Sequence, residues 1–354
     1  MREAVVENAI TGWLADRNYL VLRRNFRIRT INKIPDITAF KWSDKESISA
    51  ISIECKGYGE RAAVMPEEER TLSCIRAALA QAMLYRTTFP VVYVGVPGNP
   101  DKVSINDLRR FLEEIGVGVL MVDEEKRVHE VLTPTPVRPF CKDFYHNMLY
   151  RAIPLLAFRE VFRDKFRRGK VRYSALKYEG AWCAEDKEIQ YRTFYYPSLG
   201  EFVYFGVDAQ YKGGIAAYLS ENFDPDALWK CVEKARDKLH ASLGIREIGL
   251  LAWCFTWAGR VRKEEFLEDV SKDDISGPDD LRGAVQRLRK HALSVSAEAG
   301  SPGEIYIVTR VWNLKKGVDR DEIVSRFKCA IEAFKPVYEY LSRLASRRGS
   351  SPGA

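Results

Sequence analysis

The stretch IPDITAFKWSDKESISAISIECK, residues 34–56, contains two strand-like runs joined by a short polar turn. The turn, SDKES, is centred on Lys45. In a hairpin that is symmetric about Lys45, residues equally distant from it pair, so Asp36 lies directly opposite Glu54. The stretch therefore predicts an antiparallel hairpin that carries two facing carboxylates.

The side chains around Glu54 are predicted to alternate between the two faces of this hairpin. Lys56 comes two residues after Glu54 and points to the same face, because strand side chains alternate with a period of two. Ile51, Ile53 and Cys55 then point to the opposite face, toward the core. We therefore expect an acidic pair with a neighbouring amine on one face of the sheet.

Two facing carboxylates repel each other unless a cation neutralises them. Lys56 reduces this repulsion and leaves an oxygen-rich site suited to Mg²⁺ or Mn²⁺. The alternative is an exposed ion-pair cluster on the sheet surface, since a glutamate two residues before a lysine is common by chance. Both interpretations stay open on these residues alone.

The chain around the hairpin predicts alternating helices and strands. The spacing of apolar residues predicts a helix over 3–17, and strands are predicted over 19–30, 34–42 and 48–56. A helix over 67–88 opens on three glutamates, as the helix dipole favours. A strand over 90–97, a helix over 104–116 and a strand over 117–123 follow. The fold class is predicted to be α/β.

These residues resemble the PD-(D/E)XK, or restriction-endonuclease-like, nuclease superfamily. Its αβββαβ core, built on a mixed central sheet, matches the predicted order over residues 1–97 and extends to about residue 130. Pro35-Asp36 matches the PD element, Glu54-Cys55-Lys56 matches the ExK element, and Glu7 matches the acidic residue that many members carry in the first helix. Read alone, Glu7 would be an ordinary solvent-facing helix residue.

A second motif lies in the helix after the hairpin. Gln81 and Tyr85 are four residues apart and share one helical face. They resemble the QxxxY motif of RecB-like members, in which these side chains line the nucleic-acid side of the active site. Seen in isolation, they would be a surface pair with a half-buried tyrosine. The four cysteines of the iron–sulfur members are absent, which disfavours that subgroup.

The resemblance implies a set of site residues. Asp36 and Glu54 would hold Mg²⁺ or Mn²⁺, and Glu7 would contact the metal directly or through water. The backbone carbonyl of Cys55 would supply a further oxygen ligand, and Lys56 would orient the attacking water or stabilise charge on the phosphate.

Two flanking cations complete the candidate site. Lys33 and Arg61 are candidate phosphate contacts, although a solvated surface explains either one taken alone. With Gln81 and Tyr85, they make up the residues expected to contact nucleic acid.

The chain of 354 residues fits two domains, because single cores rarely grow past about 250–300 residues. A nuclease-like domain is predicted over 1–132 and a proline-rich linker over 133–144. A second α+β domain of unrecognised type, for substrate recognition or dimerisation, is predicted over 145–346, followed by a disordered tail over 347–354.

The composition argues against several classes of site. The net charge of +7 is a mild tilt toward polyanionic partners. Seven cysteines without CxxC spacing and four histidines without HxH or HExxH spacing argue against a zinc site. There is no Walker A motif, so an ATPase or helicase partner would be a separate chain. No membrane-spanning run or signal peptide is expected, and the predicted location is cytoplasmic.

The expected function is that of a Mg²⁺-dependent deoxyribonuclease, with endonuclease favoured over exonuclease, in DNA repair, recombination or restriction. RNA remains open as a substrate, and a homodimer remains open as the assembly. The alternatives are a catalytically inactive nucleic-acid-binding protein and an interaction subunit of a larger DNA-processing complex.

Overall fold

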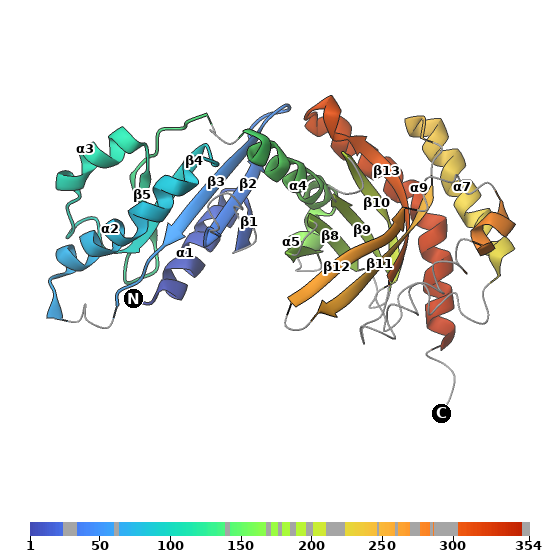
Figure 1. The fold of residues 1–354 in the computed structure, drawn as a ribbon, viewed down its shortest axis with the longest axis horizontal. Helices are drawn as coiled ribbons and strands as arrows, with labels where there is room; N and C mark the ends of the chain where they lie inside the picture. The colour runs from blue at the N-terminus through green and yellow to red at the C-terminus, as the bar shows by residue number, and fades with distance from the viewer. Residues whose placement is uncertain are drawn as a thin grey trace. The chain divides into compact units, whose positions relative to one another are not determined.

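The computed structural model describes most of the chain. The described residues are 1–23, 34–59, 64–138, 142–167, 171–175, 179–184, 189–195, 201–209, 224–245, 248–258, 261–269, 277–283, 286 and 304–348. The chain divides into two compact units, Met1–Ala152 and Ile153–Ala354 (Figure 1). Among the described residues, no helix is both long enough and apolar enough to cross a bilayer.

The N-terminal unit is built on one mixed six-stranded sheet. Its strands are β1 Leu20–Arg23, β2 Ile37–Trp42, β3 Ile48–Cys55, β4 Val91–Pro97, β5 Gly118–Val122 and β6 Val128–Leu132. They lie in the order β1-β2-β3-β4-β5-β6. The pairs β3–β4 and β4–β5 are parallel, and the other pairs are antiparallel. The predicted α/β class with a mixed central sheet is confirmed.

The helices of this unit pack on both faces of the sheet. They are α1 Glu3–Asp16, α2 Glu67–Tyr85 and α3 Asn106–Ile115. Ile10 of α1 belongs to a buried cluster with Ile37 and Ile53. Glu54, the next residue of β3, bonds to side chains of α2. Because successive strand residues point to opposite faces, α1 and α2 lie on opposite sides of β3.

The predicted register of the β2–β3 hairpin is confirmed. Its pairs run from Ile37 opposite Ile53 to Trp42 opposite Ile48, which is the symmetry about Lys45. The Asp44 carboxylate holds the turn, since it accepts hydrogen bonds from the backbone N–H of Glu46 and the hydroxyl of Ser47. An aspartate that bonds its own turn in this way helps to fix the register locally.

Some boundaries of the N-terminal unit differ from the predicted ones. β1 ends at Arg23, and the rest of the predicted strand, residues 24–30, lies outside the described residues. β6 is absent from the elements that the sequence predicts. It carries polar residues such as His129 and Glu130 and forms the edge of the sheet beside β5. A polar edge strand has no apolar run, which removes the sequence signal for it.

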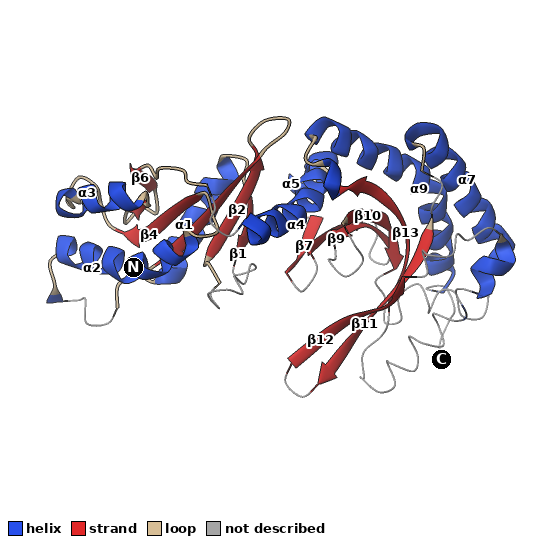
Figure 2. Ribbon diagram, turned by 45° about the horizontal axis from the view of Figure 1, so that its top comes forward, coloured by secondary structure: helices blue, strands red, loops and turns tan. Residues whose placement is uncertain are grey.

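The C-terminal unit is built on a seven-stranded antiparallel sheet. Its strands are β7 Val171–Ala175, β8 Glu179–Ala184, β9 Ile189–Tyr195, β10 Phe202–Ala209, β11 Gly249–Ala258, β12 Val261–Asp269 and β13 Glu304–Asn313. They lie in the order β12-β11-β13-β10-β9-β8-β7. Figure 2 shows this sheet as a curved layer with α9 along one of its faces.

Several helices of the described residues accompany this sheet. They are α4 Lys142–Val161, α5 Arg163–Arg167, α7 Pro225–Leu243 and α9 Arg320–Arg348. The Asp224 side chain caps α7 by accepting from the backbone N–H groups of Asp226 and Ala227. The Tyr191 ring of β9 stacks on Tyr338 of α9, with centroids 4.7 Å apart. The core of this unit therefore lies between the sheet and α9.

Two predicted boundaries are shifted here. α4 begins at Lys142, inside the stretch predicted as a linker, and the division between the two units falls within this helix. α9 continues to Arg348, two residues into the predicted tail, because no glycine or proline interrupts its last turns before Gly349. Residues 349–354 of that tail lie outside the described residues.

Candidate active site

The fold brings the described candidate residues to one end of the β2–β3 pair. Asp36 directly precedes β2, Glu54 and Cys55 end β3, and Lys56 follows it. The helix residues Glu7, Gln81 and Tyr85 come from α1 and α2, which flank β3. The two remaining candidates, Lys33 and Arg61, lie outside the described residues and stay predictions.

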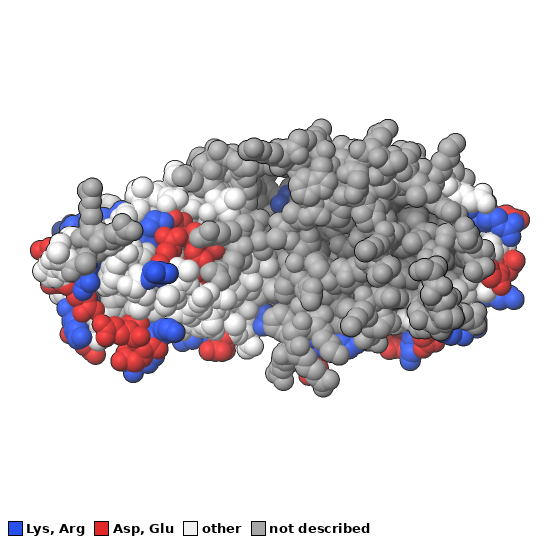
Figure 3. All heavy atoms as spheres, turned by 90° about the horizontal axis from the view of Figure 1, so that it is seen from below, with Lys and Arg blue, Asp and Glu red and all other residues white. Residues whose placement is uncertain are grey.

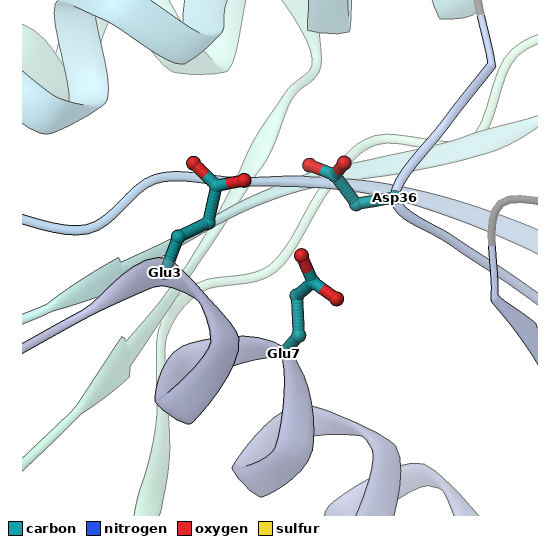
Figure 4. Close-up of side chains that lie close together, drawn as sticks. All are labelled: Glu3, Glu7 and Asp36. Atoms are coloured by element: carbon teal, nitrogen blue, oxygen red, sulfur yellow. The ribbon is translucent and has the colours of Figure 1, made fainter.

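Three carboxylates gather where α1 meets the start of β2. One carboxylate oxygen from each of Glu3, Glu7 and Asp36 lies within 4.8 Å of the other two. Figure 4 shows the three side chains pointing toward one another. Glu7 is 3% exposed and Asp36 is 9% exposed, so their charges are poorly solvated by bulk water. Hard oxygens at this spacing are the donor set that Mg²⁺ and Mn²⁺ prefer.

Glu3 is a candidate site residue that the sequence motifs do not identify. It lies one helical turn before Glu7, and residues four apart share a helix face. That spacing is visible in the sequence, but the matched motif contains only one acidic residue in the first helix and so does not point to Glu3.

Asp36 links this carboxylate group to the end of β3. Its Oδ2 accepts a hydrogen bond of 2.8 Å from the backbone N–H of Cys55. The bond holds the Asp36 side chain against the backbone between Glu54 and Lys56. The first pair of the hairpin is Ile37 opposite Ile53, so Asp36 lies one residue before the paired region. Its side chain nevertheless contacts the backbone of the ExK residues, as the hairpin symmetry predicts.

Glu54 is buried on the α2 side of the sheet, where three donors bind its carboxylate. Its Oε1 accepts from the Lys56 ammonium at 2.5 Å and from the Gln81 amide at 2.6 Å, and its Oε2 accepts from the Tyr85 hydroxyl at 3.0 Å. The contact of Gln81 and Tyr85 with nucleic acid stays a prediction. In the structure both side chains donate to Glu54 and orient its carboxylate.

The ionisation of Glu54 is set by opposing effects. Burial raises its pKa above the ordinary value of 4.5, and the nearby Asp36 charge acts in the same direction. Hydrogen bonds from Lys56 and Tyr85 act in the opposite direction and do not overcome the effect of burial. The protein therefore stabilises the charged form of Glu54 only in part, and a neighbouring cation would stabilise it further.

Lys56 contacts the two predicted metal ligands at the end of β3, the Glu54 carboxylate and the Cys55 backbone carbonyl. Its ammonium donates to Glu54 and also to the backbone carbonyl of Cys55, at 3.0 Å. Burial lowers the pKa of Lys56, but its hydrogen bond and charge interaction with Glu54 outweigh burial and raise it above 10.5. Lys56 is therefore a cation at neutral pH and acts as a donor rather than as a base.

Cys55 contributes its backbone to the site and its thiol to the core. The thiol is fully buried, and burial raises its pKa well above the ordinary value of 9.0. The negative charges of Asp36, Glu7 and Glu54 raise the pKa further. The thiol is therefore protonated at neutral pH.

Gly57 fixes the distance between α1 and the end of β3. A Cβ atom at this position would lie 2.2 Å from the backbone nitrogen of Glu3 and 2.7 Å from the backbone carbonyl carbon of Arg2. The backbone N–H of Tyr58 also donates to the carbonyl of Met1, at 2.9 Å. Because only glycine allows this approach, Gly57 lets Glu3 and Glu7 reach Asp36.

Comparison with known proteins does not assign this site to a family. Searches against protein-family models, curated proteins and solved structures found no match. The chemistry of the site therefore has to be inferred from its own side chains.

Proposed function

We propose that this protein is a metal-dependent nuclease of the PD-(D/E)XK, restriction-endonuclease-like type, which hydrolyses phosphodiester bonds of DNA. The observation that carries the proposal is the meeting of the Glu3, Glu7 and Asp36 carboxylates beside the Glu54–Lys56 pair. The element order α1-β1-β2-β3-α2-β4 agrees with the core of that superfamily.

The residues present fit a divalent cation. Glu3, Glu7 and Asp36 would hold Mg²⁺ or Mn²⁺, together with Glu54 and the backbone carbonyl of Cys55. When bound, such an ion lowers the pKa of coordinated water and neutralises charge on phosphate oxygens. The low exposure of Glu7, Asp36 and Glu54 favours cation binding, because desolvated carboxylates gain more from a neutralising partner than exposed ones do.

The protein's own groups have distinct tasks in the proposed hydrolysis. Lys56 is cationic, so it would stabilise negative charge that develops on the phosphate while water attacks phosphorus and the bond to the leaving oxygen breaks. Gln81 and Tyr85 would keep Glu54 in one orientation throughout. Burial and the Glu54 charge raise the pKa of Tyr85, so its hydroxyl remains a neutral donor.

A nucleic-acid-binding protein without catalysis is the second candidate function. One observation favours it: Lys56, Gln81 and Tyr85 already occupy both oxygens of Glu54. If all three bonds persist when a divalent cation is offered, Oε1 is fully used and only one acceptor site of Oε2 is left for the cation, which weakens Glu54 as a ligand. The same residues would then stabilise a site that binds a strand without cutting it.

The test is incubation with circular single-stranded and double-stranded DNA in Mg²⁺, Mn²⁺ or EDTA. The wild type is expected to cut both kinds of circle only when metal is present. Lys56→Ala and Asp36→Ala are each expected to lower the rate by roughly 10²–10³-fold, because each removes a group that acts on the reacting phosphate or its metal. A matched RNA circle reports the sugar preference.

Lys102→Ala is the matched control, since Lys102 is exposed in a turn outside the site, and its rate should equal that of the wild type. Degradation of linear DNA with circles spared would replace the endonuclease assignment by an exonuclease one. Binding of DNA without cutting in any metal would favour the second candidate. The proposal fails if the wild type neither cuts nor binds nucleic acid.

A further inference from the structure

Alternate residues at the end of β3 form a row that extends beyond Lys56. Glu54 bonds to Gln81 and Tyr85 of α2, and Lys56 bonds to Glu54. Tyr58, two residues further on, reaches the same helix, because its hydroxyl lies 3.0 Å from the hydroxyl of Thr71. The row therefore continues from the proposed catalytic residues to Tyr58.

The face of α2 that lies along this row ends at an arginine. Tyr85 and Gln81 contact Glu54, and the Cys74 thiol donates to the carbonyl of Gly57 at 3.4 Å. Arg70, one turn before Cys74, lies over the Tyr58 ring, with its guanidinium carbon 4.8 Å from the ring centroid. Spacings of four and seven residues place these side chains on one helix face.

The Tyr58 ring is fixed by contacts of its hydroxyl, and the Arg70 guanidinium packs on that ring. The carbonyl oxygen of Pro97 lies 3.3 Å from the Tyr58 hydroxyl and 3.0 Å from the Thr71 hydroxyl, so the three groups share the two hydroxyl hydrogens. Two anchors on the hydroxyl fix the orientation of the ring. A guanidinium over such a ring gains cation–π attraction, and its N–H groups stay available at the edge.

Arg70 forms no ion pair with an acidic side chain within the described part of the chain. Glu67, Glu68 and Glu69 precede it in the same turn, yet Arg70 forms no ion pair with any described residue. Its Nε is buried and has no hydrogen-bond partner there. A buried donor without a partner costs free energy, which an incoming acceptor would relieve.

Overall charge does not explain this arrangement. On the face that Figure 3 shows, acidic and basic atoms of the N-terminal unit lie side by side. A single preorganised arginine is therefore a better marker of an anion contact than the net charge is. Guanidinium groups bind phosphate oxygens through two parallel hydrogen bonds, a geometry that a lysine cannot offer.

We propose that Arg70, supported by Tyr58, binds a backbone phosphate of the nucleic-acid strand next to the phosphate that lies at Lys56. This inference rests on the proposed function, because it takes the strand to be the substrate. At most about 7 Å of backbone separates Lys56 from Tyr58. A strand held at Lys56 would thus bring a neighbouring phosphate to Arg70, and Arg70 would set the direction of the strand.

The test scans single-stranded DNA oligonucleotides that each carry one uncharged methylphosphonate. Affinity is measured on the full chain in an Asp36→Asn background with Mg²⁺, so that cutting does not interfere. Arg70→Gln removes the charge and keeps the stem that packs on Tyr58, while Arg70→Lys keeps the charge. Arg76→Gln is the matched control, since Arg76 is an exposed residue of the same helix that lies outside the row.

Arg70→Gln is expected to weaken binding about tenfold and to lower the slope of log affinity against log salt by about 0.7, as loss of one phosphate contact requires. At one methylphosphonate position, the parent protein should lose affinity and Arg70→Gln should lose none. Arg70→Lys should fall between the two proteins, and Arg76→Gln should match the parent.

Equal sensitivity of the parent and Arg70→Gln at every methylphosphonate position would overturn the Arg70 contact and leave the nuclease proposal intact. An unchanged salt slope in both Arg70→Gln and Arg70→Lys would do the same. Absence of any nucleic-acid binding by the parent and the wild type would instead overturn the proposed function, and the Arg70 contact with it.

Discussion

Glu54 is a residue of the site on which several hydrogen bonds converge. It is 3% exposed, lies at the end of β3, and accepts hydrogen bonds from Lys56, Gln81 and Tyr85. A buried carboxylate without these donors would cost several kcal/mol, so the donors keep the charged form accessible. They also hold it in one orientation, which a metal ligand requires.

Tyr85→Phe tests this convergence by removing one donor. The hydroxyl lowers the pKa of Glu54, so its loss should raise that pKa further above 4.5. Because a cation binds the ionised carboxylate, the pH at which Mn²⁺ affinity reaches half its maximum should move upward. We expect roughly 10–100-fold lower nuclease activity at neutral pH, as for other groups that orient metal ligands. Isothermal titration with Mn²⁺ across pH measures the shift.

Tyr93→Phe is the control for this change. The Tyr93 hydroxyl also donates to a carboxylate, Glu130, on β6. Its removal should lower the free energy of unfolding by about 1–2 kcal/mol and leave Mn²⁺ affinity unchanged. Equal effects of the two substitutions on Mn²⁺ affinity would show that Tyr85 supports only the fold.

At the scale of elements, the site depends on how closely α1 approaches the end of β3. α1 packs through Val6, Ile10 and Leu14 into the core, and this packing sets the helix orientation. The first turn is then positioned by backbone contacts with Gly57 and Tyr58. The core packing of α1 and its backbone contacts with Gly57 and Tyr58 together bring Glu3 and Glu7 to Asp36.

Gly57→Ala should therefore lower the affinity of the site for metal while the N-terminal unit stays folded. The added methyl group would collide with backbone atoms of Arg2 and Glu3, which cannot move as freely as the tip of a side chain. We expect α1 to shift at its first turn, with Mn²⁺ affinity lowered about tenfold or more. The electron paramagnetic resonance spectrum of bound Mn²⁺ should change as well, since its ligand set changes.

Gly59→Ala is the matched control, because a Cβ at Gly59 would meet no atom of the described residues within 4 Å. It should preserve both the affinity and the spectrum. If Gly57→Ala lowers the melting temperature but binds Mn²⁺ with the wild-type spectrum, the approach of α1 matters only for stability.

At the scale of the whole molecule, each unit has the elements of an independent core. The N-terminal unit contains a complete sheet with helices on both faces, and it holds every described residue of the proposed site. The loop after β6 still belongs to it, because Val137 donates to the carbonyl of Pro90 and Arg86 donates to that of Thr135. The C-terminal unit has its own sheet, packed on α9.

A fragment of residues 1–138 should consequently fold alone. It contains all of α1 to β6 and the loop that closes on Pro90. We expect a single cooperative urea transition and Mn²⁺ affinity equal to that of the full chain. A folded fragment that binds Mn²⁺ but has lost DNA affinity would assign substrate recognition to the C-terminal unit. A fragment without a cooperative transition would show that the two units depend on each other.

The β2–β3 hairpin and the order of most elements of the N-terminal unit can be predicted from local patterns in the chain. The register follows from a short turn centred on Lys45, and a local turn leaves few alternative pairings. Asp36, Glu54 and Lys56 were placed by that register, and Glu7, Gln81 and Tyr85 by their motifs. These features depend on neighbours in the sequence, whose spacing can be read directly.

The contacts between elements that lie far apart in the chain could not be predicted in this way and became visible in the folded protein. Glu3 joins the carboxylates because α1 packs against Gly57, and Arg70 is held by Tyr58 because α2 runs along the end of β3. The same holds for the strand order of the C-terminal sheet, where β13 lies between β10 and β11. Such contacts depend on how whole elements bury their apolar faces, and no local spacing encodes that choice.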